Sequence, residues 1–375
     1  MSAPRLVVLS VSAGAGHVRA AAALCAQAEA QGMTATHLDV MTLVPAWFRW
    51  LYADLYAALV NRAPLLWSVL YARMNHPAGT GWLQGLRRRI ERRVSARWLA
   101  RLDALQPDAI VCTHFLPAEV LRYRPAPPAC PLYVHVTDFD LHAMWVQPSV
   151  DRYFVACEEV AFQLQRAGVD AGRIEVTGIA LMAGFRPMAR QHAALHALGF
   201  DHTRPTVLLM GGGGGFGGLD TVAAQLLEAA PDFQLIVMAG RNAKALAALQ
   251  AMAPRWPGRL AALGFTDQVA TMMASVDLVI TKPGGLTSSE CLAIGVAMIV
   301  NDPIPGQEER NADHLLEQGA ALKAIDAATL AFRLLQLLAH PDQRTAMAGR
   351  AASLGRPDAA RDIIATIASH LKAVH

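Results

Sequence analysis

The sequence has few cysteines, little charge and no long apolar run. Its cysteines are scattered, with no Cys-x-x-Cys pair, at Cys25, Cys112, Cys130, Cys157 and Cys291. This spacing favours a reducing cytosol and argues against a cysteine-based zinc site. A helix that crosses a membrane needs about 18 or more consecutive apolar residues, and the sequence contains no run of that length. The first residues lack a basic segment followed by a long apolar stretch, so we expect no secretory signal.

The 375 residues are enough for two domains, and 54% of them are hydrophobic, which excludes a disordered chain. Apolar, strand-like runs alternate with helical stretches, a pattern typical of parallel sheets with helices on both faces. The predicted strands are Arg5–Val11, Ala109–Thr113, Pro131–Thr137, Arg152–Ala156, Thr206–Met210, Phe233–Ala239 and Val276–Thr281. We predict an α/β protein with two doubly wound domains, 1–180 and 188–355. A last helix over 356–375 can pack back on the first domain.

The segment from Pro45 to Arg101 is basic and rich in tryptophan. It contains ten Arg and no Lys against two acidic residues, which gives it a charge of +8 and leaves −5 for the rest. Five of the seven Trp also lie here. Basic residues with Trp are typical of a surface that rests on an anionic membrane. A nucleic-acid groove has a similar composition, and so does an amphipathic helical hairpin with a solvated Arg face.

A polyglycine loop follows the strand Thr206–Met210 and precedes a predicted helix. Seven glycines occupy the eight positions Gly211–Gly218. Glycine lets backbone N–H groups approach a phosphate, and the helix N-terminus adds a positive end. The loop fits the dinucleotide fingerprint, but the next predicted strand ends without the acidic residue that binds the ribose. We therefore predict a phosphate site rather than an NAD site, with a ligand-free surface loop as the alternative.

Two further loops carry polar residues after predicted strands. Lys282–Glu290 places glycines before a helix predicted from about Ser288, which again suits an anion. Glu290 can accept hydrogen bonds from two ribose hydroxyls, or it can form a capping box with Thr287. In Asp302–Asn311, prolines and a glycine fix a loop whose Gln and Glu side chains suit sugar hydroxyls. The alternative for this second loop is a solvated polar surface.

Two side chains in the first half are candidates for acid–base chemistry. His17 follows Gly14-x-Gly16 at a helix start, and an imidazole can take a proton from an alcohol, although a lone histidine can equally be structural. Asp138 follows a predicted strand and can assist a base. With Asp140 it forms an Asp-x-Asp pair that can bind a divalent metal. Helix ends can neutralise a diphosphate without a metal, so we expect no metal and no cofactor.

Together these motifs resemble the family of monogalactosyldiacylglycerol synthases and processive diacylglycerol glucosyltransferases. This family is related to the N-acetylglucosaminyltransferase that completes the lipid-linked peptidoglycan precursor. The resemblance covers nearly the whole chain and implies a GT-B fold, in which two Rossmann-like domains face each other across a cleft. It is carried by Ser12–His17, Thr137–Tyr153, Val176–Ile179, Gly211–Gly218, Gly264–Thr266, Lys282–Glu290 and Pro305–Glu308.

The resemblance also implies a role for each matching position. It makes His17 the candidate base and Asp138 its possible helper, and it leaves open which of the two takes the proton. The polyglycine loop departs from the family pattern because it offers no serine hydroxyl for phosphate. The implied UDP-sugar contacts are Phe265 and Thr266 for uracil, Glu290 for ribose, Gly213, Gly214, Gly285 and Thr287 for the diphosphate, and Gln307 and Glu308 for the hexose.

The resemblance implies an enzyme that moves a hexose from a UDP-hexose to diacylglycerol with inversion. We expect it to be cytoplasmic, peripheral on the inner face of the cell membrane, and without nucleic-acid partners. Alternatives are a UDP-sugar epimerase of the same architecture, a glycosyltransferase with another lipid acceptor, a dinucleotide-dependent oxidoreductase and a non-enzymatic UDP-sugar sensor. Donor sugar, processivity and oligomeric state stay open. The expected membrane and acceptor residues are Trp47, Trp50, Trp67, Trp82, Arg87, Arg88, Arg89, Arg92 and Arg93.

Overall fold

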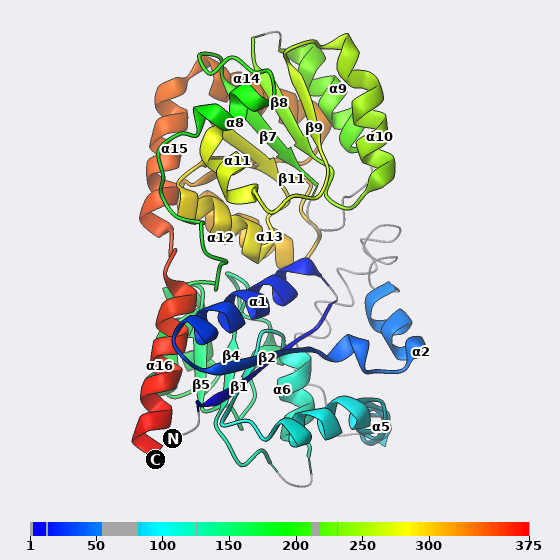
Figure 1. Ribbon diagram of the computed structural model, residues 1–375, viewed down its shortest axis with the longest axis vertical. Helices are drawn as coiled ribbons and strands as arrows, with labels where there is room; N and C mark the ends of the chain where they lie inside the picture. The colour runs from blue at the N-terminus through cyan, green and yellow to red at the C-terminus, as the bar shows by residue number, and fades with distance from the viewer. Residues whose placement is uncertain are drawn as a thin grey trace. The chain divides into compact units, whose positions relative to one another are not determined.

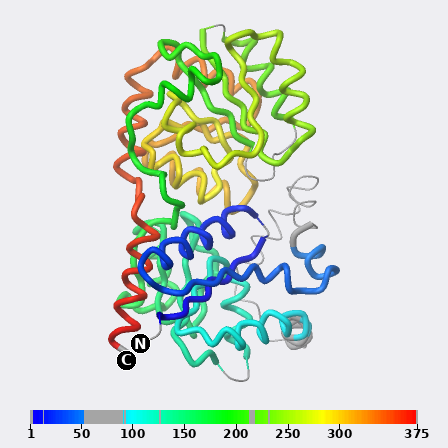
Figure 2. The backbone as a smooth tube through the Cα atoms, viewed as in Figure 1, coloured from blue at the N-terminus to red at the C-terminus, as the bar shows by residue number. Residues whose placement is uncertain are grey.

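The chain forms two compact units, each with its own sheet (Figure 1). The computed structural model describes residues 3–12, 14–54, 82–124, 127–211, 218–230 and 232–374, and at 53, 54, 82–89, 91, 92 and 374 only the backbone. The first unit comprises Met1–Ala183, Ile304–Gln307 and Asp358–His375, and the second comprises Gly184–Pro303 and Glu308–Pro357. Figure 2 lets the reader follow the chain from the second unit into its last helix, drawn in red, which belongs to the first unit.

The first unit contains a six-stranded sheet in the order β2-β1-β3-β4-β5-β6. All neighbouring strands are parallel, and Val7 of β1, for example, pairs with Ile110 of β3. The strands are β1 (Arg5–Ser10), β2 (Thr34–Asp39), β3 (Ala109–Cys112), β4 (Leu132–His135), β5 (Arg152–Val155) and β6 (Ile174–Val176). The order reverses direction between β1 and β3, and in open parallel sheets ligands bind beyond the carboxyl ends of the strands at such a point.

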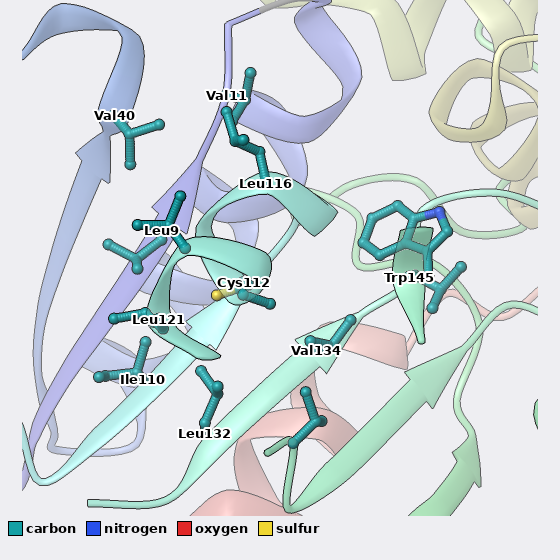
Figure 3. Packing of buried hydrophobic residues seen from close by; sticks show 14 of the residues in the cluster. Leu9, Val11, Val40, Ile110, Cys112, Leu116, Leu121, Leu132, Val134 and Trp145 are labelled. Atoms are coloured by element: carbon teal, nitrogen blue, oxygen red, sulfur yellow. The ribbon is translucent and has the colours of Figure 1, made fainter. Parts of the chain in front are cut away.

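Alternation along the strands builds a core on each face of this sheet. Leu6 and Val8 of β1 face a cluster that includes α1 (Ala15–Ala30) and α16 (Ala359–Val374), two helices that pack side by side (Figure 1). Val7 and Leu9 face the opposite cluster, where β3 and β4 pack against helix α6 and Trp145 (Figure 3). The helices on this second face are α5 (Trp82–Leu105), α6 (Phe115–Arg122) and α7 (Glu158–Arg166).

The second unit contains another parallel six-stranded sheet, in the order β12-β11-β10-β7-β8-β9. Its strands are β7 (Thr206–Met210), β8 (Gln234–Met238), β9 (Leu260–Leu263), β10 (Leu278–Thr281), β11 (Ala297–Asn301) and β12 (Ala321–Ala324). The order reverses between β7 and β10. The larger helices are α9 (Leu219–Ala229), α10 (Ala243–Met252), α11 (Val269–Ser275), α12 (Gly285–Ile294), α13 (Gln307–Glu317), α14 (Ala327–Ala339) and α15 (Pro341–Leu354).

The sheets confirm the predicted α/β class with two doubly wound, Rossmann-like halves. One helix start was predicted wrongly, because α12 begins at Gly285 and not near Ser288. The remaining short elements are α2 (Ala46–Arg49), α8 (His192–Ala197), the π-helical turn η2 (Trp50–Asp54) and the 3-10 turns η1 (Val40–Thr42), η3 (Ala143–Trp145), η4 (Ala171–Arg173) and η5 (Ala253–Arg255). Among the helices within the described ranges, none is both long and apolar enough to cross a membrane.

Candidate functional site

Three neighbouring strands of the first unit end in polar residues. His17 lies in the first turn of α1, shortly after β1. Thr113 and His114 follow β3, and Thr137 and Asp138 follow β4. Because β1, β3 and β4 are adjacent and parallel, these residues meet at one edge of the sheet, at the reversal of strand order. The sequence predicted His17 and Asp138 at this edge, and it gave no role to Thr113 or His114.

The imidazole of His17 is held through one nitrogen. Its Nδ1 lies 2.8 Å from the carbonyl oxygen of Thr113 and 2.9 Å from the hydroxyl of Thr137. A carbonyl oxygen can only accept, so Nδ1 carries the proton and the lone pair is on Nε2. The hydroxyl of Thr113 in turn donates to the carbonyl oxygen of His17 at 2.9 Å, which fixes the first turn of α1 on the end of β3.

Burial sets the protonation state of His17. Loss of solvation lowers its pKa below the ordinary value of 6.5, while the negative charge of Asp138 and the hydrogen bond to Thr113 oppose this shift in part. The net direction is downward, so the imidazole is neutral at pH 7. A neutral imidazole with its lone pair on Nε2 is in the form that accepts a proton.

Asp138 contacts a residue that was predicted for a different role. The amide Nε2 of Gln307 donates to Oδ1 of Asp138. Gln307 is the first residue of α13 and belongs to the first unit, whereas Glu308, half-buried, begins a segment of the second. The second carboxylate of the Asp-x-Asp pair, Asp140, accepts a hydrogen bond of 2.9 Å from the amide of Gln163. Within the described ranges, no three His, Cys, Asp or Glu side chains are arranged to hold a metal ion.

His114 is a second buried imidazole beside His17. The two ring centroids are 4.7 Å apart in an edge-on arrangement. Nδ1 of His114 accepts from the backbone N–H of Leu116 at 3.1 Å, so the side chain caps helix α6. Burial and the nearby His17 hold the pKa of His114 well below its ordinary value. The only signal in the sequence was a Thr-His pair directly after a buried strand.

His135, on β4, completes this group of histidines. Its Nδ1–H donates to the carbonyl of Phe154 at 3.3 Å, and its Nε2 accepts from the N–H of Ala180 at 3.0 Å. Burial lowers the pKa of His135 to about 4, with a smaller contribution from His17. His135 is therefore a neutral structural residue, and His17 is the histidine of the three whose bonds leave a lone pair on Nε2.

In the second unit, glycines lie at the reversal of strand order. Gly211 directly follows β7, and a Cβ there would come within 2.8 Å of a methyl group of Leu219, so a larger residue would have to displace the end of that side chain. Gly218 has a φ of 89°, in the left-handed region that favours glycine. The predicted phosphate residues Gly213 and Gly214 lie outside the described residues.

Helix α12 begins beside this point, because β10 pairs with β7. Gly284 is the N-cap residue and no side chain caps the helix, so the first turn, with Gly285 and Thr287, presents backbone N–H groups. The capping box proposed for Thr287 and Glu290 does not form, since both residues lie inside the helix. Glu290 is only 1% exposed, which is unusual for a carboxylate without a functional or pairing role.

The residues predicted for uracil differ in exposure and in their contacts. The ring of Phe265, two residues after β9, is 69% exposed, and the guanidinium of Arg241 lies 4.6 Å from its centroid. Thr266 accepts a hydrogen bond from the N–H of Gln268 at 3.1 Å through its hydroxyl. This bond closes a turn and leaves the Phe265 ring on the surface.

A lysine joins the two polar loops of the second unit. Nζ of Lys282 donates to the carbonyl oxygen of Asp302 at 2.5 Å and lies 3.3 Å from its carboxylate. Asp302 has a φ of 44°, an uncommon conformation for a residue with a Cβ. The contact ties the loop after β10 to the loop after β11 and holds Asp302 in this conformation.

The predicted membrane segment is described in part. Trp47 and Trp50 are 55% and 57% exposed, and Leu51, which follows Trp50 in η2, is 47% exposed. Phe48 and Tyr52, from the same segment, pack inward on the core. Trp98 of α5, the fifth tryptophan of the basic segment, is a core residue, 1% exposed. Arg93 is exposed, Trp67 lies outside the described residues, and only the backbone is described at Trp82, Arg87, Arg88, Arg89 and Arg92.

Comparison with known proteins places the chain in a family. Residues 17–181 match the family described as monogalactosyldiacylglycerol (MGDG) synthase, and residues 206–363 match the glycosyltransferase family 28 C-terminal domain. A processive diacylglycerol β-glucosyltransferase of Bacillus cereus (strain AH187) is 30% identical over 267 residues, which are 71% of this chain and 69% of that protein. The chain belongs to the family of the processive diacylglycerol β-glucosyltransferases.

The match to other members of this processive diacylglycerol β-glucosyltransferase family is shorter. The protein from Staphylococcus carnosus (strain TM300) is 32% identical over 242 residues, 64% of this chain. The chain spans 61% of the length of that relative and 59% of the length of another, from Bacillus pumilus (strain SAFR-032).

Solved structures share the fold of this family member over nearly its whole length. Acinetobacter baumannii MurG is 16% identical, covers 98% of this chain with 99% of its own, and has a TM-score of 0.64. A putative UDP-N-acetylglucosamine 2-epimerase from Listeria monocytogenes, also 16% identical, covers 100% of this chain with 98% of its own and has a TM-score of 0.62. The predicted GT-B fold is confirmed, and transferase-like and epimerase-like proteins share it.

Proposed function

We propose that the protein transfers a hexose from a UDP-hexose to diacylglycerol, with inversion, at the surface of an anionic membrane. The observation that carries this proposal is the neutral imidazole of His17, whose Nδ1–H is committed to Thr113 and whose Nε2 can accept a proton. Membership in a family whose named members are diacylglycerol glucosyltransferases supports this acceptor over the epimerase alternative.

In the proposed reaction, Nε2 of His17 takes the proton of the lipid hydroxyl as that oxygen attacks the anomeric carbon. The bond from this carbon to the diphosphate oxygen breaks on the opposite face, UDP leaves with the electron pair, and a β-linkage forms. The geometry parallels inverting hydrolysis, with an alcohol in place of water. A well-placed base contributes about 10²- to 10⁴-fold to the rate. The charge of Asp138 stabilises the imidazolium that forms.

The second unit supplies the donor side of this proposal. The negative charge of the leaving diphosphate is met by the N-terminus of α12, with Gly285 and Thr287, and by the polyglycine loop with Gly213 and Gly214. Glu290 holds the ribose. In this proposal no metal is needed, so transfer should persist in EDTA. The remaining proposed contacts are Phe265 and Thr266 with uracil, and Gln307 and Glu308 with the hexose.

The acceptor side is proposed to reach the membrane through the exposed segment Trp47–Leu51. Aromatic rings of this kind settle at the membrane–water interface, and basic residues such as Arg93 are attracted to anionic lipids. Phe48 and Tyr52 anchor the segment, because Phe48 stacks on Tyr52 and the Tyr52 ring lies 6.2 Å from the ring of His114. We place the protein at the cytoplasmic face of the membrane, where UDP-sugars are available to it.

The decisive assay incubates the protein with diacylglycerol vesicles that contain an anionic lipid and with either UDP-glucose or UDP-galactose. We expect glycosylated lipid by mass spectrometry, first with UDP-glucose because the named relatives are glucosyltransferases. An epimerase would instead yield an isomerised sugar nucleotide without lipid. Binding of UDP-sugar without any turnover would favour the sensor alternative.

Replacing the proposed base tests the mechanism directly. His17→Ala should lower kcat by about 10²- to 10⁴-fold without loss of UDP binding, because the base acts on the acceptor hydroxyl. His192→Ala, which removes an exposed imidazole of the second unit, is the matched control and should leave kcat unchanged. A His17→Ala variant that stays folded and transfers sugar at the normal rate would contradict the mechanism.

A further inference from the structure

We propose that Thr137 is a positioning residue that holds the imidazole of His17 with Nε2 as the proton acceptor. The inference rests on the proposed function, because orientation of His17 affects turnover only if this histidine is the base. It assigns a role to a side chain that the sequence analysis used only as the end of a predicted strand and as part of the motif Thr137–Tyr153.

Two acceptors from two strands share the single Nδ1–H of His17. The carbonyl of Thr113, after β3, lies 2.8 Å away, and the hydroxyl of Thr137, after β4, lies 2.9 Å away. The carbonyl fixes the tautomer, since it can only accept. One acceptor leaves the ring free to swing about that bond, whereas two acceptors in different directions define where Nε2 points. Thr113 contributes its backbone, so Thr137 is the one of the two that a substitution can remove.

The orientation of the His17 ring by Thr137 can be tested separately from the charges around the ring. Asp138 raises the pKa of His17, His114 at the N-cap of α6 lies edge-on beside its ring, and His135 is a buried, neutral imidazole on β4. Thr137 is uncharged and 4% exposed. Its replacement by the isosteric valine removes an acceptor, keeps the shape and leaves every neighbouring charge in place.

The test compares Thr137→Val with Thr137→Ser in the lipid-transfer assay. We expect Thr137→Val to lower kcat about three- to tenfold, the effect of one hydrogen bond, with KM for the UDP-hexose and the acid limb of the pH profile unchanged. Thr137→Ser restores the hydroxyl and should restore kcat. Nuclear magnetic resonance of the His17 ring gives a readout independent of activity. Nδ1 should stay protonated in both proteins, because the Thr113 carbonyl fixes the tautomer, and relaxation of the ring C–H groups should show greater ring motion in Thr137→Val.

Thr366→Val is the matched control, because its hydroxyl also makes a 2.9 Å side-chain bond in the first unit, to Glu175, away from His17. It should leave kcat and the His17 signals unchanged. The positioning role is wrong if Thr137→Val keeps full kcat while His17→Ala is inactive, or if both Val variants lose stability and kcat equally. If His17→Ala is also fully active, His17 is not the base, and the mechanism in the proposed function is wrong.

Discussion

At the scale of single residues, the state of His17 results from opposing effects on one imidazole. Burial favours the neutral form, whereas Asp138 and the Thr113 carbonyl favour the cation. The balance keeps the ring neutral at pH 7, and in the proposed reaction the same two groups stabilise the imidazolium. A base of this kind gains a proton, and loses activity, only when the pH falls below its lowered pKa.

In Asp138→Asn, the fall of kcat on the acid side of the pH–rate profile (the acid limb) should move to lower pH. Removing the carboxylate removes an interaction that raises the pKa of His17, so the pKa falls further below 6.5. The maximal kcat should also fall, because the imidazolium loses its neighbouring charge. The measurement is a pH–rate profile in the lipid assay. Asp140→Asn, which changes a carboxylate bonded to Gln163, is the control and should leave the limb in place. A limb that moves to higher pH would contradict the assigned direction.

Lys282→Met should raise KM for the UDP-hexose several-fold with a smaller change in kcat. The side chain ties the loop after β10 to Asp302, so its loss frees two loops that carry proposed donor contacts. Isothermal titration with UDP-sugar measures the same loss without turnover. Lys323→Met, on β12 of the same unit, serves as the control. If the wild type and Lys282→Met bind UDP-sugar with equal affinity, the contact between Lys282 and Asp302 does not position the donor loops.

The sequence singled out some of the candidate site residues and passed over others. His17 stood out in the sequence as a polar residue beside glycines at a predicted helix start, and Glu290 as a carboxylate shortly after a glycine pair; the structure places the first in the first turn of α1 and the second buried within α12. Thr113 and Thr137 were not, because the first acts through its backbone and the second has a common strand-end identity. The capping box failed because the N-cap position is taken by Gly284, three residues before Thr287. The assigned roles of all these residues stay predictions.

At the scale of elements, the strands buried on both faces were the most predictable. Runs such as β1 and β7 are continuously apolar because helices cover both sides of each sheet. β2 was missed because it lies at the edge of its sheet and its sequence, TATHLD, is largely polar. The count of five tryptophans in the basic segment included the buried Trp98, because composition alone does not tell which face of α5 turns inward.

The segment α2–η2 makes an element-scale prediction about lipid binding. The double variant Trp47→Ser/Trp50→Ser should bind anionic vesicles about tenfold or more weakly, because two exposed rings lose their interfacial burial. Vesicle pelleting measures this loss, and a detergent-dispersed acceptor should be glycosylated at the normal rate. The matched control is Phe162→Ser/Phe332→Ser, which removes rings that are 63% and 60% exposed on other elements. Equal pelleting of both double variants would contradict a membrane role for this segment.

At the scale of the whole molecule, the first unit is discontinuous in sequence. Its apolar face beneath α1 is closed by α16, whose Ile363, Ile364, Ile367 and Leu371 are buried against β1 and β3. Hydrogen bonds from Thr366 to Glu175 and between Tyr133 and His370 fix the same helix on the sheet. The fold of this unit therefore depends on a segment that follows the entire second unit.

Ile367→Ala should lower the free energy of unfolding by about 2–5 kcal/mol, the cost of truncating a fully buried side chain. Hydrogen exchange should accelerate in β1 and α1 while β8 of the second unit keeps its protection. Ser369→Ala, on the exposed side of α16, is the control and should change little. Uniform loss of protection in both units would show that they unfold together.

The placement of α16 has a consequence for biosynthesis. As the chain leaves the ribosome, strands β1 to β6 emerge first, but the isoleucines that cover one side of their sheet arrive only after β7 to β12 and the helices around them. The second unit can thus complete its hydrophobic core while the first still exposes apolar side chains. We expect nascent chains arrested before residue 358 to recruit chaperones through that uncovered surface, and chains extended beyond α16 to release them.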